Sequence, residues 1–358
     1  MLEMLSRVDT PALILDMFVV RKNIAKMADF FRPLPAGMRA SYSAHKSTKL
    51  AKMQMEAGAV GVSCSRLGEA EVVVSTGVMD ILVSNPVVGG LKIERLMRLL
   101  ERGVDIKVVV DDEQNVRELC RAATAQGREL GLLVEVDVGG GLGIKPGDRL
   151  IELARFVDES PNLIFRGLLA YVAGAQRIPE REKRKSAAGA AMEDVMRGKT
   201  LVEESGLEVE TVCVGGTATY EFVAQFPGVT EVLVGPYVTL DAQHAALVPE
   251  FEVAATVLST VTSCPREGVA IADAGLTTLS SDGGLPQVLA PEGVTLKLLE
   301  DEFAVLDVAP GVQLKPGSRV RFIPSHCATT ANLHNEYVCM EHERELDRWM
   351  VDGRGKTR

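Results

Sequence analysis

The chain has 358 residues, of which 46% are hydrophobic and 25% are charged. This length and composition suit an ordinary globular protein with two domains and exclude an intrinsically disordered one. The formal net charge of −10 argues against non-specific binding to nucleic acid or to an anionic membrane. The sequence has no apolar run of membrane-spanning length and no signal-peptide pattern, so we expect a cytoplasmic protein.

The six cysteines are scattered singly along the chain, and no two of them form a CxxC pair. Their spacing therefore predicts neither a disulfide framework nor a structural zinc cluster.

The first predicted elements are a short apolar strand over Thr10–Asp16 and a helix over Val19–Phe31. From Gly37 onward, short apolar runs alternate with helical stretches. The expected strands are Met38–His45, Val60–Cys64, Ile81–Ser84, Ile106–Val110, Leu132–Val138, Leu168–Tyr171, Val212–Val214 and Val232–Val234. The expected helices between them include Thr48–Gly58, Gly68–Gly77, Leu91–Gly103, Glu113–Gln126, Asp148–Glu159 and Glu182–Ser205. Eight such units predict a (β/α)8 TIM-like barrel, and a doubly wound open sheet is the competing interpretation.

After Asp241 the helical periodicity ends and β-rich runs bounded by turns follow. These runs are Phe251–Thr262, Val269–Ala272, Val294–Leu299, Val320–Ile323 and Glu336–Met340. They predict a C-terminal all-β domain, with a boundary near Val248. We therefore expect a barrel domain over residues 1–248 and a β-domain over 249–358, with residues 8–18 pairing with the β-domain.

Small residues end the last two predicted barrel strands, in the runs Val214-Gly215-Gly216-Thr217 and Val234-Gly235-Pro236-Tyr237. Glycines let backbone N–H groups approach an anion closely, and barrels commonly bind phosphate after strands seven and eight. Each run alone is equally consistent with a tight turn. Together they predict a ligand that carries phosphate.

Two other strand ends offer groups for catalysis. The first strand leads into Ser41-Tyr42-Ser43-Ala44-His45-Lys46-Ser47, with hydroxyls, an imidazole and one primary amine. The sixth strand ends at Tyr171, and Gln176 follows it. Active sites of barrel enzymes lie at the carboxyl ends of the strands, although a tyrosine there can equally be a packing residue.

In the second predicted domain, His326 and Cys327 are of residue types that bind zinc. Adjacent residues on a strand point to opposite faces, and no second histidine follows two residues later. The run therefore gives only weak support for a metal site.

Taken together, these motifs are similar to those of the D-threonine aldolase and D-serine dehydratase family. That family belongs to the alanine-racemase-like, fold-type III pyridoxal phosphate enzymes. The motifs that carry the resemblance are the GGT loop, AYxxxAQ, DAGL, SDxGLP, PxHC and NLHxEYV, between Asp9 and Gly355.

The resemblance implies a lyase that cleaves or dehydrates D-configured β-hydroxy-α-amino acids. In such enzymes a lysine holds pyridoxal phosphate as a Schiff base, and a divalent metal binds the β-hydroxyl group of the substrate. Gln176, Gly215, Gly216, Thr217, Gly235 and Tyr237 would bind the cofactor. The resemblance also implies a homodimer and a small amino-acid-like substrate.

This chain departs from the family at the residues that carry the chemistry. The family's first strand reads approximately RPHxKTHKS, and an alignment without a gap places Ser43 where the Schiff-base lysine stands. Lys46 can replace it only if the strand shifts by an odd number of residues, because such a shift exchanges the two faces. The alternative is that Lys46 is a solvated lysine at the strand end.

The expected metal site is altered as well. The family motif HCD supplies a histidine and an aspartate, whereas this chain has His326 and Ala328. A methyl group cannot bind a hard cation, so we expect weak metal binding.

These departures leave three hypotheses open. One is a pyridoxal phosphate lyase in which Lys46, His45, Ser43 and Tyr171 act in catalysis. Another is a ligand-binding or regulatory protein on the same scaffold, without Schiff-base chemistry. The third is an enzyme with a different reaction that uses His45, Tyr171 and His326 as acid–base groups.

Overall fold

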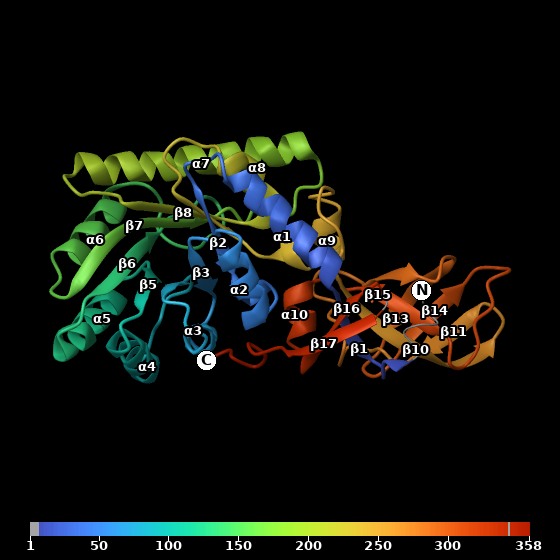
Figure 1. The fold of residues 1–358 in the computed structure, drawn as a ribbon. Coiled ribbons are helices and arrows are strands. Elements are labelled where there is room, and N and C mark those ends of the chain that lie inside the picture. Colours follow the sequence, from blue (N-terminus) through green and yellow to red (C-terminus); the bar gives the residue numbers. More distant parts are fainter. Residues whose placement is uncertain (1–6, 343) are drawn as a thin grey trace. The chain divides into compact units, whose positions relative to one another are not determined.

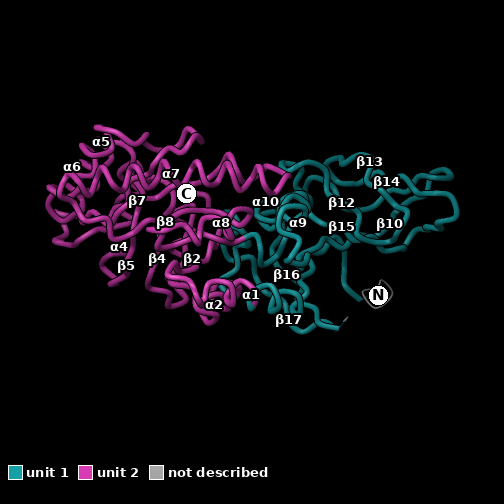
Figure 2. Tube along the Cα trace, turned by 90° about the horizontal axis from the view of Figure 1, so that it is seen from above, with its two compact units in different colours: residues 1–25, 44–49, 236–355 teal, residues 26–43, 50–235, 356–358 magenta. Residues whose placement is uncertain are grey.

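The structure, a computed structural model, describes residues 7–342 and 344–358. The first six residues, which the sequence assigns to the barrel domain, lie outside this range. The chain forms two compact units, coloured separately in Figure 2. The sheet unit comprises residues 1–25, 44–49 and 236–355, and the barrel unit comprises 26–43, 50–235 and 356–358. The segment 44–49 therefore groups with the sheet unit, although it directly follows the first barrel strand.

Strands β2 to β9 close into a parallel barrel, which confirms the predicted barrel class (Figure 1). Their bounds are Gly37–Ser41 (β2), Gly61–Cys64 (β3), Asp80–Val83 (β4), Asp105–Val110 (β5), Leu130–Glu135 (β6), Leu163–Tyr171 (β7), Thr211–Gly215 (β8) and Glu231–Val234 (β9). Closure comes from β9 pairing with β2, where Arg39 lies opposite Leu233.

Helices follow most of the barrel strands. They are α2 (Thr48–Glu56), α3 (Leu67–Val74), α4 (Gly90–Glu101), α5 (Glu113–Gln126), α6 (Asp148–Asp158), α7 (Arg181–Glu204) and α8 (Tyr220–Val223). In α4 the buried residues Ile93, Leu96, Met97 and Leu100 recur every three or four positions and form one apolar stripe. Such a stripe is buried against the outer face of a barrel, which explains why the periodic pattern located the helices.

The barrel interior is filled from one end. Near the start of the strands, Arg39 is 1% exposed and donates to Glu231 (Nε to Oε2, 2.6 Å) and to Asp80 (Nη1 to Oδ1, 2.7 Å). Lys107 donates to the same Asp80 oxygen at 3.3 Å. The neighbouring Gly61 leaves the necessary space, because a Cβ there would lie 2.2 Å from Nη1 of Arg39. These paired charges close the amino-terminal end of the barrel.

An apolar layer lies next to this charged layer. It consists of Leu82, Val109, Leu133, Leu169 and Cys213, packed against Leu233. Successive side chains of a strand point alternately inward and outward. The residues of this layer therefore face the barrel interior, as do the residues two positions before and after each of them on its strand. A binding or catalytic site can therefore form only at the other end of the barrel, where the strands have their carboxyl ends.

The sheet unit contains nine strands. They are β1 (Ala12–Asp16), β10 (Ala255–Arg266), β11 (Val269–Ala272), β12 (Gln287–Ala290), β13 (Val294–Leu299), β14 (Ala304–Val308), β15 (Arg319–Ile323), β16 (Glu336–Glu341) and β17 (Arg344–Met350). The N-terminal β1 pairs antiparallel with β10 and parallel with β16. The unit also holds the start of α1 (Met17–Phe31) and the short helices α9 (Ala242–Ala245) and α10 (Cys327–Ala331).

Several predicted strands differ from the structure in their bounds, including Leu132–Val138, which runs over Leu130–Glu135, and Leu168–Tyr171, which runs over Leu163–Tyr171. The predicted strand Met38–His45 ends at Ser41, because Tyr42–Ala44 forms a 3-10 turn. The predicted strand Phe251–Thr262 begins only at Ala255. His326 and Cys327 do not lie on a strand, since His326 is the N-terminal cap residue of α10.

Strands β12, β14 and β17 were not predicted from the sequence. In β17 almost every side chain is exposed, so the strand lacks the apolar alternation by which a strand is recognised.

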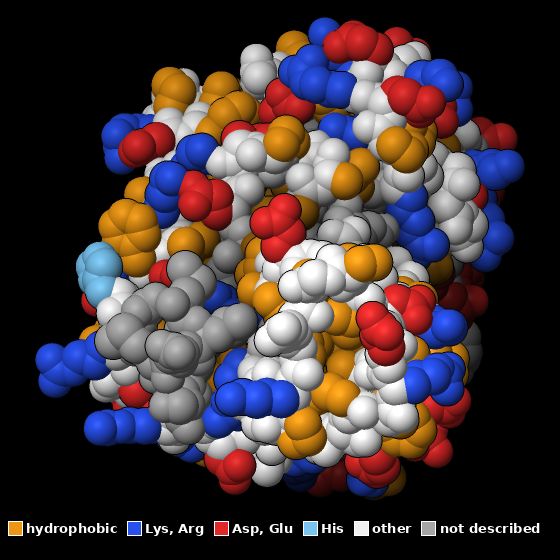
Figure 3. All heavy atoms as spheres, turned by 90° about the vertical axis from the view of Figure 1, so that its right-hand side faces the viewer, with side chains coloured by type: hydrophobic (Ala, Val, Ile, Leu, Met, Phe, Trp, Pro, Cys, Tyr) orange, Lys and Arg blue, Asp and Glu red, His pale blue; other side chains and the backbone are white. Residues whose placement is uncertain are grey.

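Among the described helices, none combines the length and the apolar character that crossing a membrane requires. On the face shown in Figure 3, acidic and basic side chains are interspersed with hydrophobic ones.

Gly167 gives a test of the barrel geometry. It has φ +135°, and a Cβ there would lie 2.0 Å from the backbone oxygen of Thr211. We expect Gly167→Ala to lower the free energy of unfolding by about 2–4 kcal/mol, because the neighbouring strand must move. Gly189 in α7 has no atom within 4 Å of such a Cβ, so Gly189→Ala should be neutral or stabilise by up to about 1 kcal/mol. Denaturant unfolding of both variants measures the difference, and equal stabilities would contradict the packing of β7 on β8.

Candidate active site at the barrel mouth

A hydrogen-bonded pair, Ser43 and Glu69, lies just beyond the first barrel strand. Ser43 Oγ donates to Glu69 Oε2 at 2.5 Å. The backbone N–H of Ser65, one residue past β3, donates to Ser43 Oγ (2.8 Å) and to the same carboxylate oxygen (3.1 Å). Glu69 is 1% exposed, so its carboxylate depends on these donors in place of water. The position that the resemblance assigns to a Schiff-base lysine therefore holds a hydroxyl bound to a buried carboxylate.

Lys46 lies outside the strand. Strand β2 ends with Ser41 opposite Ser63, so no register shift includes Lys46 in it. The backbone at Lys46 has φ 54°, and its carbonyl oxygen accepts a hydrogen bond from Gly353 N at 3.0 Å. The segment 44–49 is thus bound within the sheet unit, and a catalytic role for Lys46 stays a prediction.

His45 and Tyr237 are fully buried in the sheet unit. The carbonyl oxygen of His45 accepts a hydrogen bond from Tyr337 Oη at 2.7 Å. The ring of Tyr237 lies 5.5 Å from that of Phe251, measured between centroids. Both side chains contribute to packing in this unit, and their catalytic and cofactor roles stay predictions.

The two glycine loops after β8 and β9 are joined by hydrogen bonds. Gln176 accepts from Ala218 N at 3.0 Å and donates to Thr219 Oγ1 at 2.7 Å. Gly235 N donates to Thr217 Oγ1 at 3.2 Å. A Cβ at Gly216 would come within 3.0 Å of Oε1 of Gln176. Glycine at this position therefore allows the loop to lie against the Gln176 amide, and the structure brings together Gln176, Gly215, Gly216, Thr217 and Gly235.

Three carboxylates gather beyond β5 and β6. Glu135 is 6% exposed, and burial, followed by the negative charges of Asp111 and Asp137, raises its pKa to about 7. Asp137 behaves in the opposite way. Its Oδ1 accepts from the N–H groups of Gly139 and Gly141, both at 2.9 Å, and these bonds lower the pKa of Asp137. The barrel mouth thus contains one carboxyl group that exchanges protons near neutral pH beside one that stays ionised.

Tyr171 is the last residue of β7 and is 47% exposed. Partial loss of solvent raises the pKa of its phenol, and the nearby charge of Arg177 opposes this shift. The hydroxyl is therefore protonated at neutral pH and can donate a hydrogen bond.

The predicted metal residue His326 is bound to Asp282 in the sheet unit, with Nδ1 2.8 Å from Oδ2. The second position of the motif is Ala328, which offers no ligand atom. Burial raises the pKa of the Cys327 thiol well above its ordinary value, so it is a poor source of thiolate. In the part of the chain that the structure describes, no group of three histidine, cysteine or acidic side chains is placed to hold a metal. The residues present do not fit the metal site that the resemblance implies.

Two family models together match most of the chain. "Alanine racemase, N-terminal domain" matches residues 15–242, and "Putative serine dehydratase domain" matches residues 254–340. A 3-hydroxy-D-aspartate aldolase of Paracoccus denitrificans (strain Pd 1222) is 35% identical, over 98% of this chain and 93% of its own length. A D-threonine aldolase of Arthrobacter sp is 34% identical, over 99% and 95%.

The chain belongs to the D-threonine aldolase and D-serine dehydratase family.

The fold agrees with this assignment. The crystal structure of D-threonine aldolase from Filomicrobium marinum superposes with a TM-score of 0.95 at 34% identity, covering 98% of this chain and 97% of that one. The similar proteins include aldolases and a D-threo-3-hydroxyaspartate dehydratase, all of which are lyases that act on D-configured β-hydroxy amino acids. Family membership therefore implies pyridoxal phosphate in general.

The barrel unit fits one part of this cofactor and not another. The loops at Gly216 and Gly235 are fixed against Gln176 and Thr217, in the manner of a phosphate-binding turn. A Schiff base requires a primary amine, and the turn after the first barrel strand presents Ser43 instead. Among the described residues, no barrel strand ends in a lysine, and Lys145 lies exposed on the loop after β6. The barrel unit thus fits a phosphate group but not a covalent link at position 43.

Two residues of this site, Glu135 and Glu69, received no role from the sequence. Glu135 is an acidic residue in an otherwise apolar strand. It lies two residues after Leu133, so the alternation of side chains along the strand places both on the inner face of the barrel. Glu69 lies in the first turn of α3, and no sequence signal showed that it would meet Ser43.

The raised pKa of Glu135 predicts how stability varies with pH. The pKa of Glu135 is higher in the folded protein than in the unfolded chain. As the pH rises from about 4.5 to 7, the unfolded chain therefore loses this proton more easily than the folded protein, and the free energy of unfolding falls. Glu135→Gln removes this cost, which is about 3 kcal/mol at full ionisation. The variant should exceed the wild type in Tm at pH 8 and match it near pH 4.5. A difference in Tm that is the same at both pH values would contradict the raised pKa of Glu135.

Proposed function

We propose that this protein is a lyase that acts on D-configured β-hydroxy-α-amino acids with the help of bound pyridoxal phosphate. The observation that carries the proposal is the match to D-threonine aldolase and 3-hydroxy-D-aspartate aldolase at 34–35% identity over almost the whole chain. This sequence similarity covers both units, so it includes the residues of the barrel mouth and those of the sheet.

Pyridoxal phosphate, when bound, supplies an aldehyde that reacts with amines and a ring that accepts electrons from the substrate. The phosphate would be held by the backbone of Gly215 and Gly216 and by the hydroxyl of Thr217, which Gly235 N positions with a hydrogen bond at 3.2 Å. Gln176 acts through these loops, because its amide fixes Ala218 and Thr219.

Glu135 is the proposed acid–base group of the barrel. Cleavage between the α and β carbons requires that the β-hydroxyl group lose a proton. A carboxyl group with a pKa of about 7 is suited to accept that proton at neutral pH. Tyr171 can donate a hydrogen bond to an oxygen of the substrate, and Asp137 supplies a fixed negative charge for an ammonium group.

The proposal is tested by incubating the protein, pyridoxal phosphate and a divalent cation with D-threonine, 3-hydroxy-D-aspartate and D-serine. The aldolase reaction gives glycine together with acetaldehyde or glyoxylate, and the dehydratase reaction gives ammonia and a keto acid. We expect product from at least one D-substrate and none from the L-isomers.

The failure of all three D-substrates would refute the lyase and leave a ligand-binding protein.

A matched pair of variants tests the role of Glu135. Glu135→Gln should lower kcat/KM by about 10²-fold or more and remove the rise of rate near pH 7. Glu113→Gln, on the solvent side of α5, is the control and should keep both the rate and the pH profile. Retention of the pH profile in Glu135→Gln would assign the acid–base role to another group.

We also propose a cytoplasmic homodimer, on the basis of composition and family resemblance. Sedimentation of the purified protein tests the oligomeric state, and a monomer at micromolar concentration would contradict it.

A further inference from the structure

We propose that the barrel mouth holds pyridoxal phosphate reversibly, without a covalent bond to a lysine, and that the Ser43–Glu69 pair occupies the place of the anchoring amine. This inference rests on the proposed function in naming the cofactor. It concerns how this chain binds that cofactor.

Ser43 is hydrogen-bonded within the protein. Its hydrogen is directed to Glu69 Oε2 and its oxygen accepts from Ser65 N. The hydrogen of the hydroxyl and one of its acceptor sites are thus used within the protein. A serine hydroxyl cannot form a carbon–nitrogen bond, so this side chain can only border a bound ligand.

Glu69, the partner of Ser43, is buried and only 1% exposed. A buried carboxylate needs a nearby donor, and Ser43 Oγ and Ser65 N fill that need at 2.5 and 3.1 Å. The same carboxylate lies within reach of a longer, positively charged side chain at position 43. Ser43→Lys should therefore be accepted by the fold and should place an amine at the mouth.

The hydrogen bonds of the proposed phosphate-binding loops do not involve Ser43. They run among Gln176, Ala218, Thr219, Thr217 and Gly235. A ligand held by its phosphate group can therefore bind while the covalent link is missing. Such binding is reversible and competes with inorganic phosphate.

The experiment uses the full-length protein with stoichiometric pyridoxal phosphate. Calorimetry measures binding in the presence and absence of inorganic phosphate, and borohydride followed by peptide mass spectrometry detects a covalent link. A lysine amine and the aldehyde condense with loss of one water, and hydride transfer from borohydride then makes the bond permanent. We expect saturable binding that phosphate weakens at least tenfold, and no peptide with the mass of a reduced adduct.

Two results overturn the inference. One is a stoichiometric adduct on a single lysine, such as Lys46 or Lys145, that phosphate prevents. The other is no binding of pyridoxal phosphate. Both results can be told apart from a failure of the lyase assay. A protein with covalently bound pyridoxal phosphate can be an active lyase, and a protein that binds the cofactor reversibly can be inactive.

Ser43→Lys and Ser43→Ala form the matched pair, with folding checked by circular dichroism and thermal melting. Ser43→Lys should gain a visible absorbance band and a reduced adduct on the peptide containing residue 43. Ser43→Ala should bind the cofactor as reversibly as the wild type. A folded Ser43→Lys protein that binds the cofactor without forming the adduct would show that Ser43 is not at the amine's place. If Ser43→Lys does not fold, the wild-type result alone decides.

Discussion

The filling of the barrel interior is the constraint on which the rest of the site depends. Arg39, Glu231, Asp80 and Lys107 close one end with paired charges. The apolar layer around Leu133 and Leu169 fills the middle. Because no ligand can enter a packed core of this kind, binding and catalysis are confined to the carboxyl ends of the strands and the loops that follow them.

At that end the eight strands provide hydroxyls, carboxylates and glycine backbone. The carboxyl groups differ because their surroundings differ. Burial raises the pKa of Glu135 to about 7, whereas backbone N–H donors lower the pKa of Asp137 and keep it ionised. This separation of pKa values gives the mouth both a proton acceptor and a permanent charge. The chemistry that this chain supplies from its own residues is therefore proton transfer and ion pairing, and the electron sink has to come from the cofactor.

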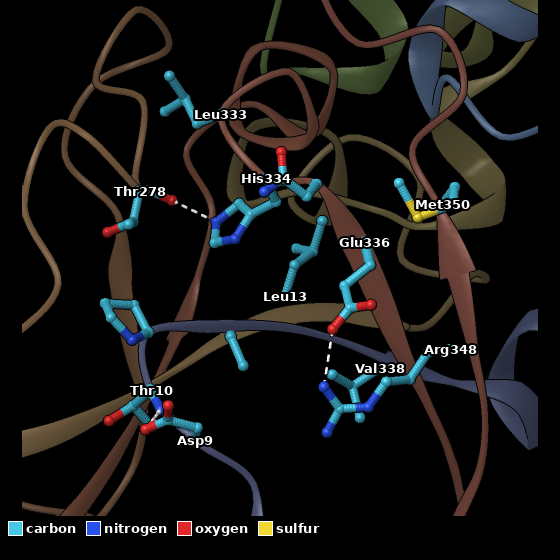
Figure 4. A pocket seen from close by; sticks show the side chains of 13 residues that line it. Asp9, Thr10, Leu13, Thr278, Leu333, His334, Glu336, Val338, Arg348 and Met350 are labelled. Atoms are coloured by element: carbon cyan, nitrogen blue, oxygen red, sulfur yellow. Dashed lines mark hydrogen bonds and ion pairs between the residues drawn. The ribbon is translucent and has the colours of Figure 1, made fainter.

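Acidic residues also organise the sheet unit, where they have structural roles. Asp273 accepts from Thr10 Oγ1, Ser259 Oγ and Thr260 N, and so fixes the N-terminal strand against β10. Asp241 accepts from His244 and from Cys327 N and joins α9 to the start of α10. Figure 4 shows a cavity of about 640 Å³ in this unit. Its lining includes His334, whose ring bonds Thr278 O at 2.8 Å, and the Glu336–Arg348 pair. Several motif residues of this unit thus serve to hold strands and turns in place.

The sequence by itself determined the barrel class, the change to a β-rich second half and the altered residues at Ser43 and Ala328. Periodic apolar patterns and glycine turns are local properties of the chain, so they can be read without coordinates. Only the tertiary structure decided that β2 stops at Ser41, that Lys46 is bound to the segment around Gly353, and that Ser43 meets Glu69. These outcomes depend on contacts between residues far apart in the chain, and the raised pKa of Glu135 depends on burial, which no local pattern encodes.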